Sequence, residues 1–200
     1  AVDLAALRSP SSRQQATQAL SAAGYRTVEV PGVHSPYLEL PGSWEDLLAG
    51  ASRNLRSQLG RRRRALEREG RLRFRTSAAT GEELERDLAA FFRVEASGWK
   101  SGSGTAILSD PRTTRLYTEF ARAAAAAGWL RLQLLELDGV AVAADLNCRF
   151  AGGTFLLKTG FDERYGAFSP GLVLRGEVLR AAIEEGARFY DFLGGPDHYK

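Results

Sequence analysis

The sequence predicts an α/β fold in which a mixed, mostly antiparallel sheet is flanked by helices. Helical and short extended segments alternate in the first half, and three extended segments with short glycine turns then follow in quick succession. A further helix and one more extended segment come last. Strands joined by tight turns pair antiparallel, whereas a strand–helix–strand unit places its two strands parallel. Together these patterns indicate helices layered on one mixed sheet.

Residues 1–70 are divided into segments by glycine, proline and capping serine. Ser43 has the character of an N-cap, with Asp46 at the third helical position. We expect helices over Ser11–Ala23, from Ser43 to Ala49 and over Ser52–Glu69, and strands over Tyr25–Val30 and Tyr37–Leu40.

The middle of the chain continues with one strand and two helices. Leu84, Leu88, Phe91 and Phe92 repeat at helical spacing after the capping residue Thr80. A strand is expected over Leu72–Thr76, a glycine-serine loop over 99–104 and an alanine-rich helix over Thr113–Gly128.

A three-stranded meander and a strand–helix–strand unit complete the prediction. Asp138-Gly139 has the composition of a two-residue hairpin turn. Strands are expected over Leu130–Leu137, Val140–Phe150 and Thr154–Gly160, followed by a loop over Phe161–Gly171, a helix over Leu172–Glu185 and a strand over Arg188–Leu193.

The composition excludes several classes of protein. No apolar run approaches the roughly 18 residues that a membrane span needs, and no charged-then-apolar leader begins the chain. Cys148 is the sole cysteine, which excludes an internal disulfide and fits a reducing cytoplasm. One thiol and two histidines argue against a structural zinc site, so we expect no metal. The expected location is cytoplasmic or peripheral to a membrane.

Positive charge is concentrated between Arg53 and Arg75, where ten arginines face two glutamates. Such a cluster suits a phosphate-rich partner such as tRNA, a lipid-linked precursor or an anionic membrane surface. Arg61–Arg64 spread around more than half of a helix circumference, so we expect that they cannot all meet one flat partner. A solvated helix face paired with acidic residues, or a face that meets another part of a longer protein, are the alternatives.

The segment Ser169-Pro170-Gly171 follows a strand and opens a helix. The first backbone N–H groups of a helix lack partners, and the helix dipole favours an anion there. Proline presets the first turn and glycine allows close approach of a phosphate. Arg175, one turn further on, would add a charged contact. Simple capping of the helix is the alternative.

The run FDERY…SPG…YDFLGG…YK resembles the carboxy-terminal half of the GNAT-like acyltransferases grouped with the cellulose-biosynthesis protein CelD, and more distantly the FemABX peptidyltransferases. The motifs around Ser52–Ser57, Gly98-Trp99-Lys100, Gly104–Ala106 and Gly139–Ala144 agree with it. The resemblance covers about residues 35–200. It implies the acyl-CoA N-acyltransferase fold, with residues 1–34 joining a missing amino-terminal half and the chain stopping before a final hairpin.

The resemblance also implies a donor site for acetyl-CoA or another acyl-CoA. Leu156–Thr159 would flank the pantetheine, and the pyrophosphate would lie on Ser169, Pro170, Gly171, Leu172 and Val173. The loop before this helix has one glycine where acetyltransferases usually have two. Aminoacyl-tRNA, the donor of FemABX relatives, is therefore an alternative to acyl-CoA.

Acyl transfer from a thioester needs a deprotonated acceptor, a stabilised oxyanion and a proton for the departing thiolate. Asp162 and Asp191 are the candidate bases, and Tyr165 or Tyr199 the candidate acid. The alternatives are that Asp162 pairs with Arg164 or caps a turn, and that Asp191 is a buried partner for an arginine. Three further basic residues and one tryptophan are expected near donor or acceptor: Lys158 towards donor phosphate or substrate, and Trp99, Lys100 and Lys200 towards the acceptor.

The sequence thus leaves three hypotheses for the function. The first is acyl transfer from acyl-CoA to an amine or hydroxyl of a polysaccharide or cell-envelope precursor. The second is a module that binds nucleic acid through the arginine helix. The third is a catalytically silent scaffold for the other half of a longer protein.

Overall fold

The computed structural model describes residues 10–28, 35–77, 79–97 and 106–193. The chain forms two compact units, of which the first combines residues 1–37 with residues 192–200. In that unit, helix α1 (Pro10–Ala22) agrees with the prediction. The predicted strand over Tyr25–Val30 is wrong for its first four residues, which form no regular structure. Tyr25 and Val28 remain 57% and 82% exposed, because alternating apolar residues form a strand only where a neighbouring strand offers hydrogen bonds.

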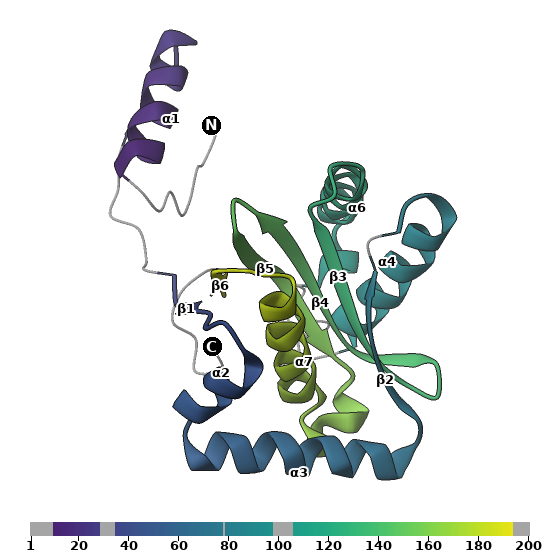
Figure 1. The fold of residues 1–200 in the computed structure, drawn as a ribbon. Coiled ribbons are helices and arrows are strands. Elements are labelled where there is room, and N and C mark those ends of the chain that lie inside the picture. The colour runs from purple at the N-terminus through teal and green to yellow at the C-terminus, as the bar shows by residue number, and fades with distance from the viewer. Residues whose placement is uncertain (1–9, 29–34, 78, 98–105, 194–200) are drawn as a thin grey trace. The chain divides into compact units, whose positions relative to one another are not determined.

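The second unit, residues 38–191, contains the sheet and its helices (Figure 1). The six strands lie in the order β1-β6-β5-β4-β3-β2. Their bounds are β1 Tyr37–Glu39, β2 Leu72–Ser77, β3 Leu130–Leu137, β4 Val140–Phe150, β5 Gly153–Phe161 and β6 Phe189–Asp191. Strands β2 to β5 pair antiparallel, and β5 pairs with β6 in parallel. The predicted mixed, mostly antiparallel sheet is confirmed.

The first two helices of this unit begin where the sequence predicted, each with a capping serine. Ser43 accepts the Asp46 N–H at 3.1 Å at the start of α2, and Ser52 accepts the Leu55 N–H at 3.2 Å at the start of α3. Thr80 precedes the third without a side-chain cap hydrogen bond, and the fourth begins at Pro111 rather than at Thr113, because Asp110 caps it. The helices are α2 Trp44–Gly50, α3 Arg53–Glu69, α4 Gly81–Ala96, α6 Pro111–Ala126 and α7 Pro170–Glu184, with short 3-10 helices η1 Ile107–Ser109 and η2 Glu163–Phe168.

Two boundaries near the predicted donor site differ from the sequence prediction. Helix α7 begins at Pro170 rather than Leu172, because Ser169 takes a left-handed φ of 53° that ends η2 and starts the helix at once. Strand β6 is shorter than predicted, and Leu193 beyond it takes a left-handed φ of 48° that interrupts extended structure. Both hairpin turns of the meander have two consecutive positive φ values, at Asp138-Gly139 and Ala151-Gly152, as the right-handed twist of hairpins favours.

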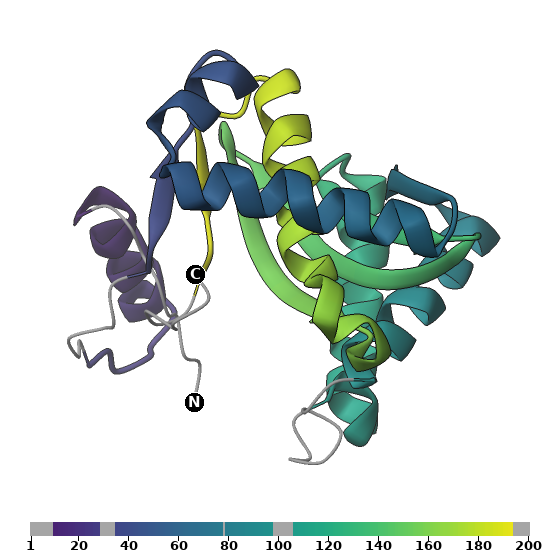
Figure 2. The same cartoon turned by 90° about the horizontal axis from the view of Figure 1, so that it is seen from below.

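The two faces of the sheet are covered by different helices (Figures 1 and 2). Helices α4 and α6 pack on one face, where leucines of β3 and β4 join Leu88 and Phe91 in the main hydrophobic core. Helix α7 packs on the opposite face, and α3 packs against α7. Because successive residues of a strand point to opposite faces, neighbouring residues of β5 serve different layers.

One partly buried ion-pair cluster joins β2, α4 and β3. The Arg75 guanidinium donates to both carboxylate oxygens of Asp87 at 2.8 and 2.7 Å and to Glu136 at 3.0 Å. Burial alone would raise the pKa of Asp87, but hydrogen bonds from Arg75 and Ser77 outweigh it and hold that pKa below its ordinary value. The ionised carboxylate is therefore favoured in the folded state.

This arrangement predicts a pH-dependent contribution to stability. Because the pKa of Asp87 is lower in the folded than in the unfolded chain, its contribution is present above the ordinary value of 3.8 and is lost as the pH falls below it. We expect the difference in unfolding free energy between the wild type and Asp87→Asn to shrink as the pH falls through this range. Urea titrations at a series of pH values measure it, and a constant difference would contradict the prediction.

Candidate functional site

Strands β5 and β6 diverge after three paired residues. The parallel pairing joins Gly153 to Phe189 and ends where Phe155 faces Asp191. Strand β5 continues to Phe161, paired with β4 along its other edge. Within the described chain, residues 156–161 thus have no strand on the β6 side. The predicted pantetheine segment Leu156–Thr159 lies along this open edge.

Strand β5 is also irregular at this point. Leu146 of β4 faces Lys158, but the next residue, Asn147, faces Leu156, so Leu157 is the extra residue of a β-bulge. A bulge bends the strand and changes the direction of the groups beside it. The irregularity therefore lies within the open segment of β5.

The start of α7 offers fewer free amides than the sequence suggested. Pro170 has no N–H, and the N–H groups of Leu172 and Val173 both donate to the Ser169 carbonyl, at 3.0 and 3.3 Å. In the described part of the chain, only the Gly171 N–H of this first turn has no acceptor. The expected cradle of several amides is thus reduced to one donor plus the helix dipole.

The cation of Arg62, which sequence reasoning did not single out, lies beside the start of α7. One guanidinium nitrogen of Arg62, on α3, donates to the Ala167 carbonyl at 2.6 Å, two residues before Ser169. Arg62 thereby ties α3 to the η2 turn and brings positive charge near the first turn of α7. No sequence signal could have distinguished it from its three neighbouring arginines.

Arg175 lies in a buried polar network rather than at an open phosphate site. Its guanidinium is 2.9 Å from an oxygen of Asp145 and also contacts the hydroxyl of Tyr190. The Tyr190 hydroxyl donates to Asn147 at 2.8 Å, and Asn147 donates to Gln133 at 2.6 Å. Burial raises the pKa of Tyr190 despite the nearby Arg175 charge, so the phenol stays neutral. This network joins α7 to β3, β4 and β6, and a contact of Arg175 with donor phosphate stays a prediction.

Asp191 and Lys158 lie on the face of the sheet that α4 and α6 cover, opposite to the face covered by α7. Lys158 is the cross-strand partner of Leu146, a member of the core under α4 and α6, and Asp191 faces Phe155 at the point where β5 and β6 separate. Cross-strand partners lie on the same face. Asp191 is 1% exposed. The start of α7 belongs to the other face, so the position of Lys158 favours contact with substrate over contact with donor phosphate.

Two residues of α4 and α6 complete this second face, and sequence reasoning missed both. Glu95 is 1% exposed and accepts the Ile107 N–H at 2.9 Å. Its backbone touches β5 so closely that a Cβ on Gly160 would lie 2.5 Å from the Glu95 Cα. The Lys158 ammonium lies 5.6 Å from the centroid of the Tyr117 ring. Burial together with the Glu95 charge raises the pKa of Tyr117.

The remaining predicted site residues lie either in and beside η2 or outside the described chain. Asp162 caps η2 through the Arg164 N–H and pairs with the Arg164 guanidinium at 2.6 Å. These hydrogen bonds lower the pKa of Asp162, which weakens it as a base. Tyr165 lies on η2 and donates its N–H to the Asp162 carbonyl. Trp99, Lys100, Tyr199 and Lys200 lie outside the described residues.

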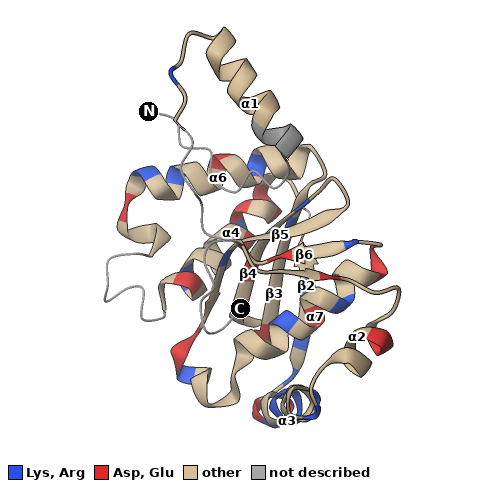
Figure 3. Ribbon diagram, turned by 90° about the vertical axis from the view of Figure 1, so that its left-hand side faces the viewer, with Lys and Arg blue, Asp and Glu red and all other residues tan. Residues whose placement is uncertain are grey.

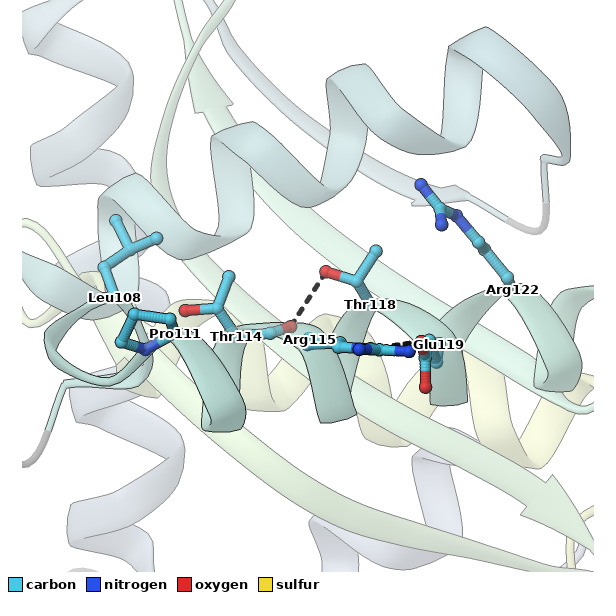
Figure 4. A pocket seen from close by; sticks show the side chains of 7 residues that line it. All are labelled: Leu108, Pro111, Thr114, Arg115, Thr118, Glu119 and Arg122. Atoms are coloured by element: carbon cyan, nitrogen blue, oxygen red, sulfur yellow. Dashed lines mark hydrogen bonds and ion pairs between the residues drawn. The ribbon is translucent and has the colours of Figure 1, made fainter.

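An apolar cavity of about 630 Å³ runs along one side of α7. Leucines of β1, α2 and α3 line it together with Trp44, and α7 contributes Leu172, Arg175, Gly176 and Leu179. A second, open depression of about 590 Å³ lies on α6, where Thr118 donates to the Thr114 carbonyl and Arg115 pairs with Glu119 (Figure 4). Of the predicted site residues, Leu172 and Arg175 line the first of these hollows and none lines the second.

The described residues hold neither a metal-ligand cluster nor a membrane-spanning helix. Residues 10–28, 35–77, 79–97 and 106–193 contain no group of three or more histidine, cysteine, aspartate or glutamate side chains placed to hold a metal ion. In the same ranges no helix has the length and apolarity required to cross a membrane.

The family model of the acetyltransferase (GNAT) domain matches residues 53–200. The chain therefore belongs to the GNAT acetyltransferase domain family, and its mixed sheet has the acyl-CoA N-acyltransferase fold. A search of curated proteins finds no match. The finer assignment to the CelD type stays a proposal.

Several solved structures share the fold. FemX is 16% identical with a TM-score of 0.60, over 92% of this chain and 61% of FemX. A C-terminal DUF2156 domain assigned to a lysylphosphatidylglycerol synthetase of Agrobacterium fabrum is 14% identical with a TM-score of 0.54, over 94% of this chain and 60% of that one. A conserved protein of unknown function from Bacteroides thetaiotaomicron is 13% identical with a TM-score of 0.51, over 92% and 57%. The chain thus spans about 60% of the length of these structures.

The buried network under α7 predicts a large loss of stability when one partner is removed. Asp145→Asn would leave the Arg175 cation buried without its carboxylate, and we expect a loss of about 3 kcal/mol in unfolding free energy. The matched control, Glu119→Gln, removes an exposed pair whose side chains are 79% and 58% exposed and should cost less than about 1 kcal/mol. Urea unfolding measures both, and similar losses in the two variants would contradict this role of the network.

Proposed function

We propose that this protein transfers an acyl group from acyl-CoA to an amine or hydroxyl of a polysaccharide or cell-envelope precursor. The observation that carries the proposal is the open edge of β5 beyond its last pair with β6. No strand of the described chain lies beside this edge, so an extended ligand such as a pantetheine chain would have room to lie along it. The GNAT family match and the fold shared with FemX support acyl transfer in general.

The donor would approach from the α7 side of the sheet. Its diphosphate would accept from the Gly171 N–H at the positive end of the α7 dipole, with the Arg62 charge nearby. The pantetheine would run along Leu156–Thr159 towards Asp191, where the two strands meet. The thioester would then lie at the junction between the two faces of the sheet.

The acceptor would approach from the face that carries Asp191, Lys158, Tyr117 and Glu95. The lone pair of the acceptor nitrogen or oxygen would attack the thioester carbonyl carbon, and the Asp191 carboxylate would take the proton of that N–H or O–H group. The Lys158 ammonium would stabilise negative charge on the carbonyl oxygen. As the C–S bond breaks, its electron pair leaves with the thiolate, which takes a proton from a tyrosine such as Tyr165 or Tyr199.

Transfer from aminoacyl-tRNA is the second candidate. It is favoured by the single free amide at the start of α7, which makes a weaker diphosphate cradle than several amides would. Isothermal titration with acetyl-CoA separates the two candidates. Binding of acetyl-CoA supports the proposed donor, whereas no heat with acetyl-CoA together with binding of aminoacyl-tRNA favours the second. A catalytically silent scaffold would bind neither.

Gly171→Ala tests the donor site. The added Cβ meets its nearest atom, on Phe161, at 3.6 Å, which is an ordinary contact, so the fold should tolerate it. The methyl group would hold phosphate away from the Gly171 N–H, and losing one charge-assisted hydrogen bond should weaken acetyl-CoA binding at least about tenfold. Isothermal titration measures the effect against Gly50→Ala, where a Cβ meets nothing within 4 Å. Equal affinities would argue against a diphosphate at this helix start.

Asp191→Asn tests the base. The amide cannot accept the acceptor's proton, so we expect kcat to fall about 100-fold or more while the Kd for acetyl-CoA is kept. Single-turnover assays with a panel of amine and hydroxyl acceptors measure the rate. Asp162→Asn is the control, because the Asp162 carboxylate is engaged by Arg164 and its loss should affect the η2 turn more than the chemical step. An unchanged rate in Asp191→Asn would exclude Asp191 as the base.

A further inference from the structure

The arginines of α3 divide into two sets with different surroundings. Arg56 donates to the carbonyl oxygens of Leu48 and Ala49 at the end of α2, at 2.9 and 3.1 Å. Arg62 donates to η2, and Arg63 pairs with Glu67 at 2.9 Å and with Glu177 of α7. These three arginines hold neighbouring elements in place, so they are not available to a partner.

The second set lies on a single exposed face of α3. It consists of Arg53, Arg61, Arg64 and Arg68, all of them exposed; we call these four residues the arginine stripe. At 100° per residue they fall within a sector of about 80°, and from first to last they span about 22 Å along the helix. Within the described ranges no carboxylate forms an ion pair with any of them. Figure 3, which views α3 nearly along its axis, shows basic residues on this helix.

The sequence predicts that Arg61–Arg64 cannot all meet one flat partner. The positions of these arginines in the structure show which of them can. Arg61–Arg64 do spread around the helix, but the structure turns Arg62 and Arg63 towards the protein and leaves Arg61 and Arg64 facing solvent. A sector of about 80° is narrow enough for every guanidinium in it to touch one plane. Four guanidinium groups that have no carboxylate partner among the described residues therefore form a flat basic surface on α3.

We propose that the arginine stripe docks the protein on an anionic phospholipid surface. Guanidinium groups bind phosphate strongly, and basic residues near an anionic bilayer each contribute additively to binding. The other residue in the sector is Ser57, so the stripe has no aromatic side chain on which a nucleic-acid base would stack. The apolar side of α3 faces α7, with Leu66 buried, so binding is electrostatic and involves no insertion of the helix.

Docking through the stripe would place the donor site close to lipid. Arg62, on the side of α3 that faces away from the stripe, contacts the turn that leads into α7, so a membrane at the stripe and the start of α7 would be separated by a single helix. An acceptor attached to a lipid would then be presented to the enzyme at the bilayer surface. The docking itself does not depend on the proposed acyl transfer and is tested without it.

The experiment is co-sedimentation with vesicles of phosphatidylcholine alone and of phosphatidylcholine mixed with phosphatidylglycerol. We expect binding to the anionic vesicles only, weakening as salt rises. Arg61→Gln/Arg64→Gln should reduce the partition coefficient about 30-fold. The control Arg86→Gln/Arg112→Gln removes the same charge from exposed positions on α4 and α6 and should bind nearly as well as the wild type.

The competing outcomes are distinct. Absence of binding to anionic vesicles, equal binding to neutral ones, or equal losses in the two double variants would overturn the proposal. Tighter binding of polyuridylate than of vesicles through the same arginines would also overturn it, because the partner would then be a nucleic acid. Acetyl-CoA titration of Arg61→Gln/Arg64→Gln should match the wild type, so a failure of docking and a failure of the proposed donor site are separable.

Discussion

The candidate site depends on the buried ion pair between Arg175 of α7 and Asp145 of β4. Asp145 and Asn147 are completely buried, and together with Tyr190 they connect the first turns of α7 to the strands beneath it. An ion pair in an apolar interior is costly to break by removing one partner. It therefore restricts how α7 lies on the sheet, and with it where the Gly171 N–H points relative to the open edge of β5.

Strand β5 separates the donor side of the proposed reaction from the acceptor side. Residues of β5 alternate between the α7 face and the face covered by α4 and α6. A donor held at the start of α7 and an acceptor held beside Lys158 would meet only at the edge where β5 and β6 diverge. The close packing of α4 on Gly160 fixes the second face as firmly as Arg175 fixes the first. Positioning of this kind is a large part of what an acyltransferase requires.

The arginine helix illustrates how one sequence feature can serve two purposes. Arg56, Arg62 and Arg63 satisfy carbonyl groups and carboxylates of α2, η2 and α7, which is a structural role. The arginine stripe has no such partners in the described chain, and its concentrated charge is the basis of the proposed membrane docking. Charge counts alone treat all of these residues as equivalent. Only their positions around the helix and the groups opposite them distinguish the two sets.

Local patterns in the sequence determined most of the secondary structure and the order of its elements. Serine caps, glycine turns and helical repeats act within a few residues, so the meander and helix α3 could be predicted closely. Tertiary structure decided the rest, because pairing, burial and charge neutralisation depend on residues distant in sequence. The alternating segment at Tyr25 formed no strand, Arg175 paired with Asp145, and Asp162 paired with Arg164. Tyr117 came to lie beside Lys158, and Glu95 packs against Gly160.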